Sequence, residues 1–132
     1  MGIAQRKERE KELRRESILQ AAEQIILQKG HEKLHMDEVA ERAELSKGTL
    51  YLYFNSKTEL IVGIVHKAMA ILDHTFSEVI TRDLTGIEII HQLAKEYLVF
   101  AERHPEYYSA MQFYENLNGS ADLSDSEYLQ NC

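Results

Sequence analysis

Cysteine and proline are nearly absent from the 132-residue chain, and tryptophan is absent altogether. The single cysteine is Cys132, the last residue, so we expect neither a disulfide framework nor a cysteine metal site, and a reducing compartment fits. One proline, Pro105, and six glycines give few points at which a helix must break, which favours a mostly helical fold. Apolar runs are short and the N-terminus is charged, so we expect no membrane span, no secretory signal and a cytoplasmic location.

An excess of positive charge is also missing, because 15 basic residues stand against 22 acidic ones and the net charge is −7. Taken alone, this balance argues against a nucleic-acid partner. The charge is unevenly divided, however: residues 1–57 hold 11 Lys or Arg and 10 Asp or Glu (net +1), whereas residues 58–132 hold 4 and 12 (net −8). The asymmetry permits an anion-binding front end on an acidic body.

Apolar residues recur at helical spacing along the chain, without strand-like alternation, and predict an all-α protein. The expected helices cover residues 4–29, 36–43, 47–54, 57–81, 86–103 and 105–117. Stop and cap signals set these bounds at Gly30, Ser46, Ser56 with Glu59, Thr85 with Glu88, and Ser124 with Glu127, the last pair opening one more helix. In the helix over 86–103 we expect an inward face made of Ile87, Ile90, Leu93, Ala94, Tyr97, Leu98 and Ala101.

Two short helices separated by only three residues, with a helix before them, predict a helix-turn-helix. The first short helix offers the small residue Ala40 at the contact, the turn ends on apolar Leu45, and the second short helix has Leu50 as its inward anchor. The outer face of the second helix is then free for a DNA major groove, and its N-terminus suits a phosphate.

The string from Met36 to Leu60, MDEVAERAELSKGTLYLYFNSKTEL, resembles the DNA-binding domain of tetracycline-repressor-type (TetR) transcriptional regulators. The resemblance covers about residues 14–65. It implies an all-α fold in which an N-terminal three-helix helix-turn-helix head, residues 1–56 with the motif at about 36–55, is joined by a long helix to an α-helical body. That body, residues 57–132, would bind an effector and dimerise, and we expect it to be incomplete because chains of this family are usually considerably longer.

Carried over to matching positions, the resemblance implies DNA-binding roles for His35, Ser46, Lys47, Gly48, Thr49, Tyr51, Tyr53 and Lys57. Two residues depart from the family pattern. Glu44 replaces the usual turn glycine, where a positive φ costs about 1 kcal/mol or somewhat more, and His35 replaces a capping threonine. The basic segment 6–15 either reaches the DNA backbone or minor groove or is a solvated helix end, because acidic residues are interleaved in it. Phe54 is expected in the core.

Six of the eleven aromatic residues lie between residues 97 and 114. With neighbours on the long helix they could line an effector pocket, for which the candidates are His66, Phe76, Tyr97, Phe100, Tyr107, Met111 and Tyr114. A plain core or a subunit contact explains the same residues. The six histidines have no metal-ligand spacing and no nucleophile set or phosphate loop is present, so we expect no enzyme activity, no metal and no cofactor.

The resemblance, together with the long connecting helix, therefore implies a ligand-responsive DNA-binding regulator, a repressor that binds a palindromic operator as a homodimer and is released by a small effector. Its partners would be double-stranded operator DNA, a small molecule and a second copy, with no membrane. The alternative is a truncated interaction module that lacks independent operator binding.

Overall fold

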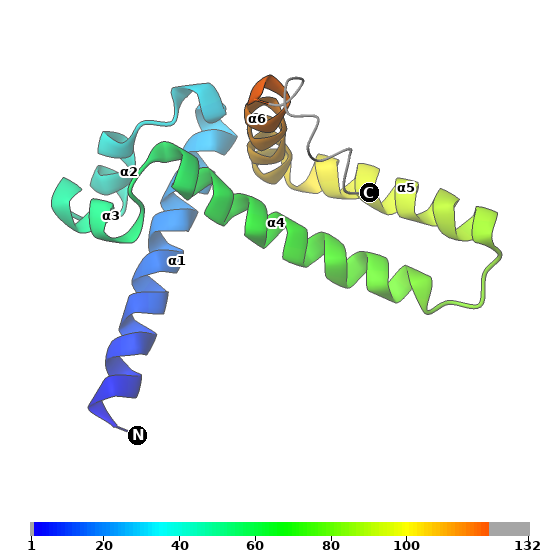
Figure 1. Cartoon of the computed structure of the whole chain (residues 1–132), viewed down its shortest axis with the longest axis horizontal. Helices are drawn as coiled ribbons and strands as arrows, with labels where there is room; N and C mark the ends of the chain where they lie inside the picture. Colours follow the sequence, from blue (N-terminus) through cyan, green and yellow to red (C-terminus); the bar gives the residue numbers. More distant parts are fainter. Residues whose placement is uncertain (1, 122–132) are drawn as a thin grey trace.

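A computed structural model describes residues 2–121, and over that range the chain forms six α-helices, a short 3₁₀ turn and no strand (Figure 1). The all-α prediction is confirmed. The elements are α1 (Ile3–Lys29), η1 (His31–Lys33), α2 (Met36–Arg42), α3 (Lys47–Tyr53), α4 (Lys57–Ile80), α5 (Gly86–Arg103) and α6 (Pro105–Ala121).

The head is built from the second half of α1 together with α2 and α3. Apolar side chains from all three helices and from the start of α4 share one core, in which the fully buried members include Ile18, Ile25, Leu34, Val39, Leu50 and Leu60. Phe54, directly after α3, is 2% exposed, which confirms its assignment to the core. Burial of this apolar surface is the main force that holds α3 in place.

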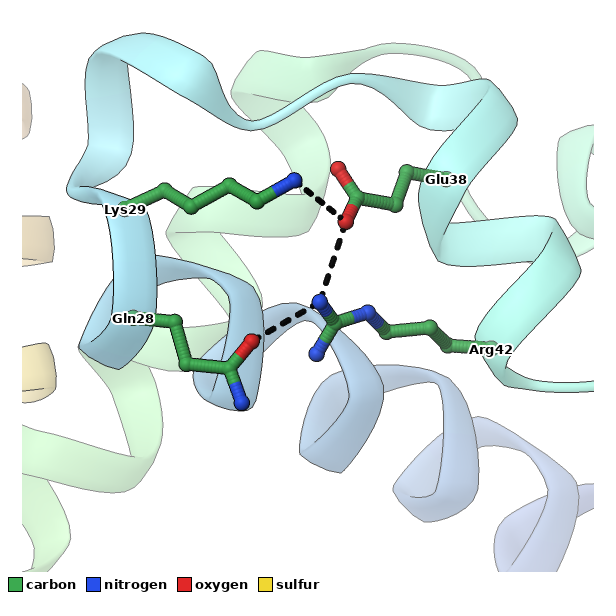
Figure 2. A network of polar contacts seen from close by, with 4 residues as sticks. All are labelled: Gln28, Lys29, Glu38 and Arg42. Atoms are coloured by element: carbon green, nitrogen blue, oxygen red, sulfur yellow. Dashed lines mark hydrogen bonds and ion pairs between the residues drawn. The ribbon is translucent and has the colours of Figure 1, made fainter.

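A polar network ties α2 to the end of α1 on the outside of this core (Figure 2). The Glu38 carboxylate of α2 accepts from Lys29 Nζ at 2.9 Å and from Arg42 Nη2 at 3.0 Å, and Arg42 also donates to Gln28. The bond from Lys29, more than that from Arg42, holds the pKa of Glu38 below its ordinary value. The network therefore sets the position of α2 on α1 with side chains that remain partly in water.

Helix α4 leaves the head and runs the length of the body, α5 returns along it, and α6 lies across α4 and the C-terminal end of α1 (Figure 1). Eight residues of α4 are buried, as expected of a central helix. In residues 2–121, α4 is also the one helix long and apolar enough to cross a membrane by length and composition, which the short apolar runs did not indicate.

Several local predictions need correction. Helix α6 continues to Ala121 rather than ending near residue 117. The expected inward face of α5 is largely open to solvent, since Ile87, Ile90 and Leu98 are 65–83% exposed; the described part of the chain provides no layer that covers them. The predicted helix start at Ser124 lies outside the described residues.

Two predicted helix caps can be compared directly. Thr85 and Glu88 form the full reciprocal capping box. At α4 only half of the box is present, because Ser56 Oγ accepts from the Glu59 amide while the Glu59 carboxylate accepts from the Asn55 amide instead.

Candidate nucleic-acid interface

Helix α3 is anchored on one side and open on the other. Its N-cap is Ser46, whose Oγ accepts from the Thr49 amide at 3.2 Å and donates to Thr49 Oγ1 at 2.9 Å. Leu50 is fully buried, while Lys47, Gly48 and Tyr51 are exposed on the outer face. The capped and anchored helix therefore leaves its outer face accessible to solvent.

The turn before α3 has the conformation that its sequence position demands. Glu44 has φ 58°, in the left-handed region, which confirms that a residue other than glycine holds a positive φ there. The Leu45 amide then donates back to the Ala40 carbonyl at 2.9 Å, which closes the end of α2. The turn thereby sets the angle at which α3 leaves α2.

His35 and Lys47, two of the residues expected to contact DNA, are exposed. His35 is the N-cap residue of α2 and its side chain makes no cap hydrogen bond, as expected for a histidine in place of a threonine. Lys47 forms a solvent-exposed ion pair with Asp37 at 3.0 Å. An exposed pair of this kind contributes only about 0–1 kcal/mol, so Lys47 can exchange its carboxylate for a phosphate.

Tyr53 and Lys57 are less open than the residues around them. Tyr53 is half-buried and packs on the head core. Lys57, the first residue of α4, has its Nζ 5.6 Å from the centre of the Phe113 ring of α6. Lys57 therefore lies where the head, α4 and the body meet.

Sequence reasoning missed Leu52, which is 84% exposed between Tyr51 and Tyr53. Its position on α3 indicates this exposure, because at 100° per residue Leu52 points away from the buried Leu50. An apolar side chain that is exposed on the outer face of α3 suits contact with a thymine methyl group or a sugar.

The candidate effector residues fall into two groups. His66 of α4 and Met111 and Tyr114 of α6 line a hollow of about 350 Å³ together with Val62, Val65, Met69 and Glu115. Phe100 and Tyr107 are instead buried and stack with centroids 6.3 Å apart, with His104 against both rings. Tyr97 lies beside Phe100, and Phe76 packs on the core. The second group is therefore part of the body's own packing.

An ionic junction links α1, α4 and α6. Lys67 Nζ of α4 lies 2.6 Å from Glu16 Oε1 and 2.6 Å from Glu23 Oε1, both on α1, and over the ring of Tyr107 of α6. Burial alone would lower the pKa of Lys67, but its bonds to Glu16 and Glu23 raise that pKa above the ordinary value. Burial raises the pKa of Tyr107, and the Glu23 charge adds to the effect.

A second head–body contact lies at η1. His31 Nδ1 and Ser109 Oγ of α6 form a hydrogen bond at 2.8 Å, and the His31 and Phe113 rings pack edge to face.

Over residues 2–121, no group of three or more His, Cys, Asp or Glu side chains is placed to hold a metal ion.

A capped helix with an open polar face, set by a tight left-handed turn on a three-helix core, defines the class as a helix-turn-helix head. Residues 18–64 match the family model for bacterial regulatory proteins of the tetR family. The match covers the head, which is therefore of the tetR type, and the relatives of this head are transcriptional regulators, not enzymes.

The relatives agree with this assignment. An uncharacterized HTH-type transcriptional regulator of Haemophilus influenzae is 26% identical over 117 residues (89% of this chain, 62% of the relative). YvdT of Bacillus subtilis, likewise an uncharacterized HTH-type transcriptional regulator, is 36% identical over 95 residues (69% and 47%). The HTH-type transcriptional repressor KstR of Mycolicibacterium smegmatis is 42% identical over 60 residues (46% and 29%). The chain thus spans less than two thirds of the length of the curated relatives that it matches.

A solved TetR-like transcriptional regulator from Rhodococcus sp. RHA1 has the same fold. The TM-score is 0.64 at 24% identity, over 83% of this chain and 63% of that one.

Proposed function

We propose that the protein is a ligand-responsive transcriptional regulator, a repressor that binds operator DNA through α3 as a homodimer. The observation that carries the proposal is the outer face of α3, where exposed Lys47, Gly48 and Tyr51 stand on a capped and anchored helix. Such a face fits a major groove, with base contacts along the helix and phosphate contacts at its ends. His35, Ser46, Thr49, Tyr53 and Lys57 complete the proposed contact set, in a cytoplasmic protein.

Release by an effector would use the hollow between α4 and α6. His66, Met111 and Tyr114 lie in its wall, and α4 continues from there into the head. A small molecule that separates α6 from α4 would shift α4 relative to α1 and so change the spacing of two recognition helices in a dimer. Two half-sites one helical turn apart tolerate little change in that spacing.

The exposed apolar residues of α5 favour a second candidate function. Ile87, Ile90 and Leu98 form a row that no described segment covers. The same row suits the homodimer of the repressor or, in the alternative, an interaction module that acts by pairing with another protein and has no operator binding of its own.

Fluorescence anisotropy of a labelled duplex from upstream of the gene tests the proposal, with a scrambled duplex beside it and the mass of the protein measured by light scattering. We expect specific binding by a dimer. Tyr51→Ala should weaken it at least tenfold, about 1.4 kcal/mol, while Tyr108→Ala, an exposed tyrosine on α6, should leave it unchanged. Specific binding that survives Tyr51→Ala would contradict a role for α3, and a dimer with no preference for the upstream duplex would favour the interaction module.

Lys57 gives a second test within the same assay. Lys57→Ala should lower the slope of log affinity against log salt by about one, because one phosphate contact is lost. Lys95→Ala, which removes an exposed lysine of α5, is the matched control and should not change the slope. Equal slopes for the two variants would remove Lys57 from the interface.

A further inference from the structure

The N-terminal half of α1 continues the inward face of the helix with a different chemistry. From residue 18 onward that face is apolar and buried, with Ile18, Ala22 and Ile25 at 0% exposed. Counting back at 100° per residue, Arg14, Lys11 and Lys7 fall on the same arc of roughly 80°. The helix face that is apolar and buried from residue 18 onward is therefore basic over residues 7–14.

Two surface hollows locate this face relative to the helix-turn-helix. One, of about 440 Å³, lies between Lys11 and Arg15 of α1 and Leu52 and Tyr53 at the end of α3. Another, of about 350 Å³, lies between Arg14 of α1 and the α2–α3 turn, at Ala43 and Leu45. The basic face thus lies between the turn and the end of α3, and the N-terminal half of α1 runs on past α3 (Figure 1).

The charges on this face are available. Lys7, Lys11 and Arg14 are exposed, and none of them forms an ion pair with another described residue. Arg15 differs, because its guanidinium carbon lies 4.7 Å from the centre of the Phe54 ring, so this side chain packs against the head.

The remaining charges of this half-helix lie on other arcs. Glu8 and Glu12 lie on the side of the first hollow, Glu10 on the side of the second, and Arg6 and Arg9 are turned away from the head. The acidic residues therefore flank the arc of Lys7, Lys11 and Arg14 on both sides and do not lie within it.

We propose that Lys7, Lys11 and Arg14 form a second phosphate-binding surface, which holds the DNA backbone beside the groove occupied by α3. The inference rests on the proposed DNA binding. The three residues span roughly 10 Å of helix, and each DNA strand carries one phosphate per about 3.4 Å of axis, so neighbouring phosphates lie within their reach. Contacts of this kind supply affinity and salt dependence without reading the bases.

A charge-matched pair of double variants tests the surface. Lys7→Gln with Lys11→Gln removes two charges from the proposed surface, and Arg6→Gln with Arg9→Gln removes two charges from the other side of the same turns. Glutamine keeps helix propensity, which circular dichroism verifies. Affinity for the upstream and scrambled duplexes is measured at several salt concentrations.

We expect the first double variant to flatten the salt slope by about two units, since each phosphate contact contributes about 0.9. It should weaken both duplexes by the same factor and so preserve the specificity ratio, while the Arg6/Arg9 variant stays near the wild-type slope. Equal slopes for the two double variants would overturn the proposal, as would a change in oligomeric mass in place of a change in slope. Absence of specific binding by the wild-type protein would instead count against the proposed function itself.

Discussion

Glu44 shows how a single residue shapes the head. Its φ of 58° lets α2 end and α3 begin with only four residues between them, and the Leu45 amide donates to the Ala40 carbonyl. A side chain in this region costs roughly 1–2 kcal/mol because its Cβ approaches the backbone. The strain was predicted because Glu44 stands where the family that the sequence resembles usually has a turn glycine.

Glu44→Gly should therefore raise the free energy of unfolding. We expect a gain of about 0.5–1 kcal/mol after the extra freedom that glycine gives the unfolded chain is subtracted, measured by urea denaturation. Glu44→Ala is the control, because it removes the charge but keeps the Cβ. A gain of the same size in the alanine variant would assign the effect to charge and not to the backbone.

At the scale of elements, the crossing of α4 over α1 depends on Gly63. A Cβ added there would lie 3.0 Å from Leu19 Cδ2 and 3.3 Å from Phe54 Cε1. The absence of a side chain lets the long helix come close to the helix that carries the head. The periodicity of α4 predicted its length and apolar face but gave no sign of this contact.

Gly63→Val should overpack the crossing and lower the free energy of unfolding by about 1–3 kcal/mol. Gly86→Val is the matched control, since a Cβ at Gly86 meets nothing within 4 Å. Thermal and urea denaturation of both variants measure the difference. Equal effects of the two valines would mean that the crossing at Gly63 is not tightly packed.

For the whole molecule, head and body are joined by side chains from three helices. Lys67 of α4 lies between Glu16 and Glu23 of α1, under Tyr107 of α6. The His31–Ser109 bond and the contact of Lys57 with Phe113 join the same two parts farther along α6. Movement of α6 against α4 therefore bears directly on the position of α1.

The junction predicts how stability depends on pH. The pKa of Lys67 is raised by its bonds to Glu16 and Glu23, against the opposing effect of burial, so its contribution is complete below the unfolded pKa of about 10.4 and is lost as pH rises through the folded value. The pKa of Tyr107 is raised mainly by burial, so the unfolded chain ionises first and stability falls in the same direction. We expect the free energy of unfolding to decline above about pH 10.

Lys67→Met should cost about 1–3 kcal/mol at pH 8, because two neighbouring carboxylates lose their common partner. The difference from wild type should shrink between pH 10 and 11. Denaturation series at several pH values measure it, with Lys95→Met as the control on an exposed lysine of α5. A deficit that is constant across pH would mean that Lys67 stabilises through its methylene chain and not through its charge.

The candidate site was predictable where it depends on neighbours in sequence. Ser46 as cap, Leu50 as anchor and the exposed residues around Tyr51 all follow from positions within one turn of each other. Leu52 was missed although the same spacing exposes it. The partial burial of Tyr53 depends on the head core, and the contact of Lys57 with Phe113 depends on α6, which is distant in sequence. No local sequence pattern predicts either contact.

The sequence by itself determined the helices and most of their ends, because caps and periodicity are effects of nearby backbone and side-chain groups. Its resemblance to a known head predicted the left-handed turn. Only the tertiary structure decided which faces are covered. Ile87 and Ile90 satisfy the helical pattern of α5 yet are exposed, while Tyr107 and Phe100 enter the core. An apolar stripe requires a partner, and the identity of that partner depends on the packing of segments that are distant in the chain.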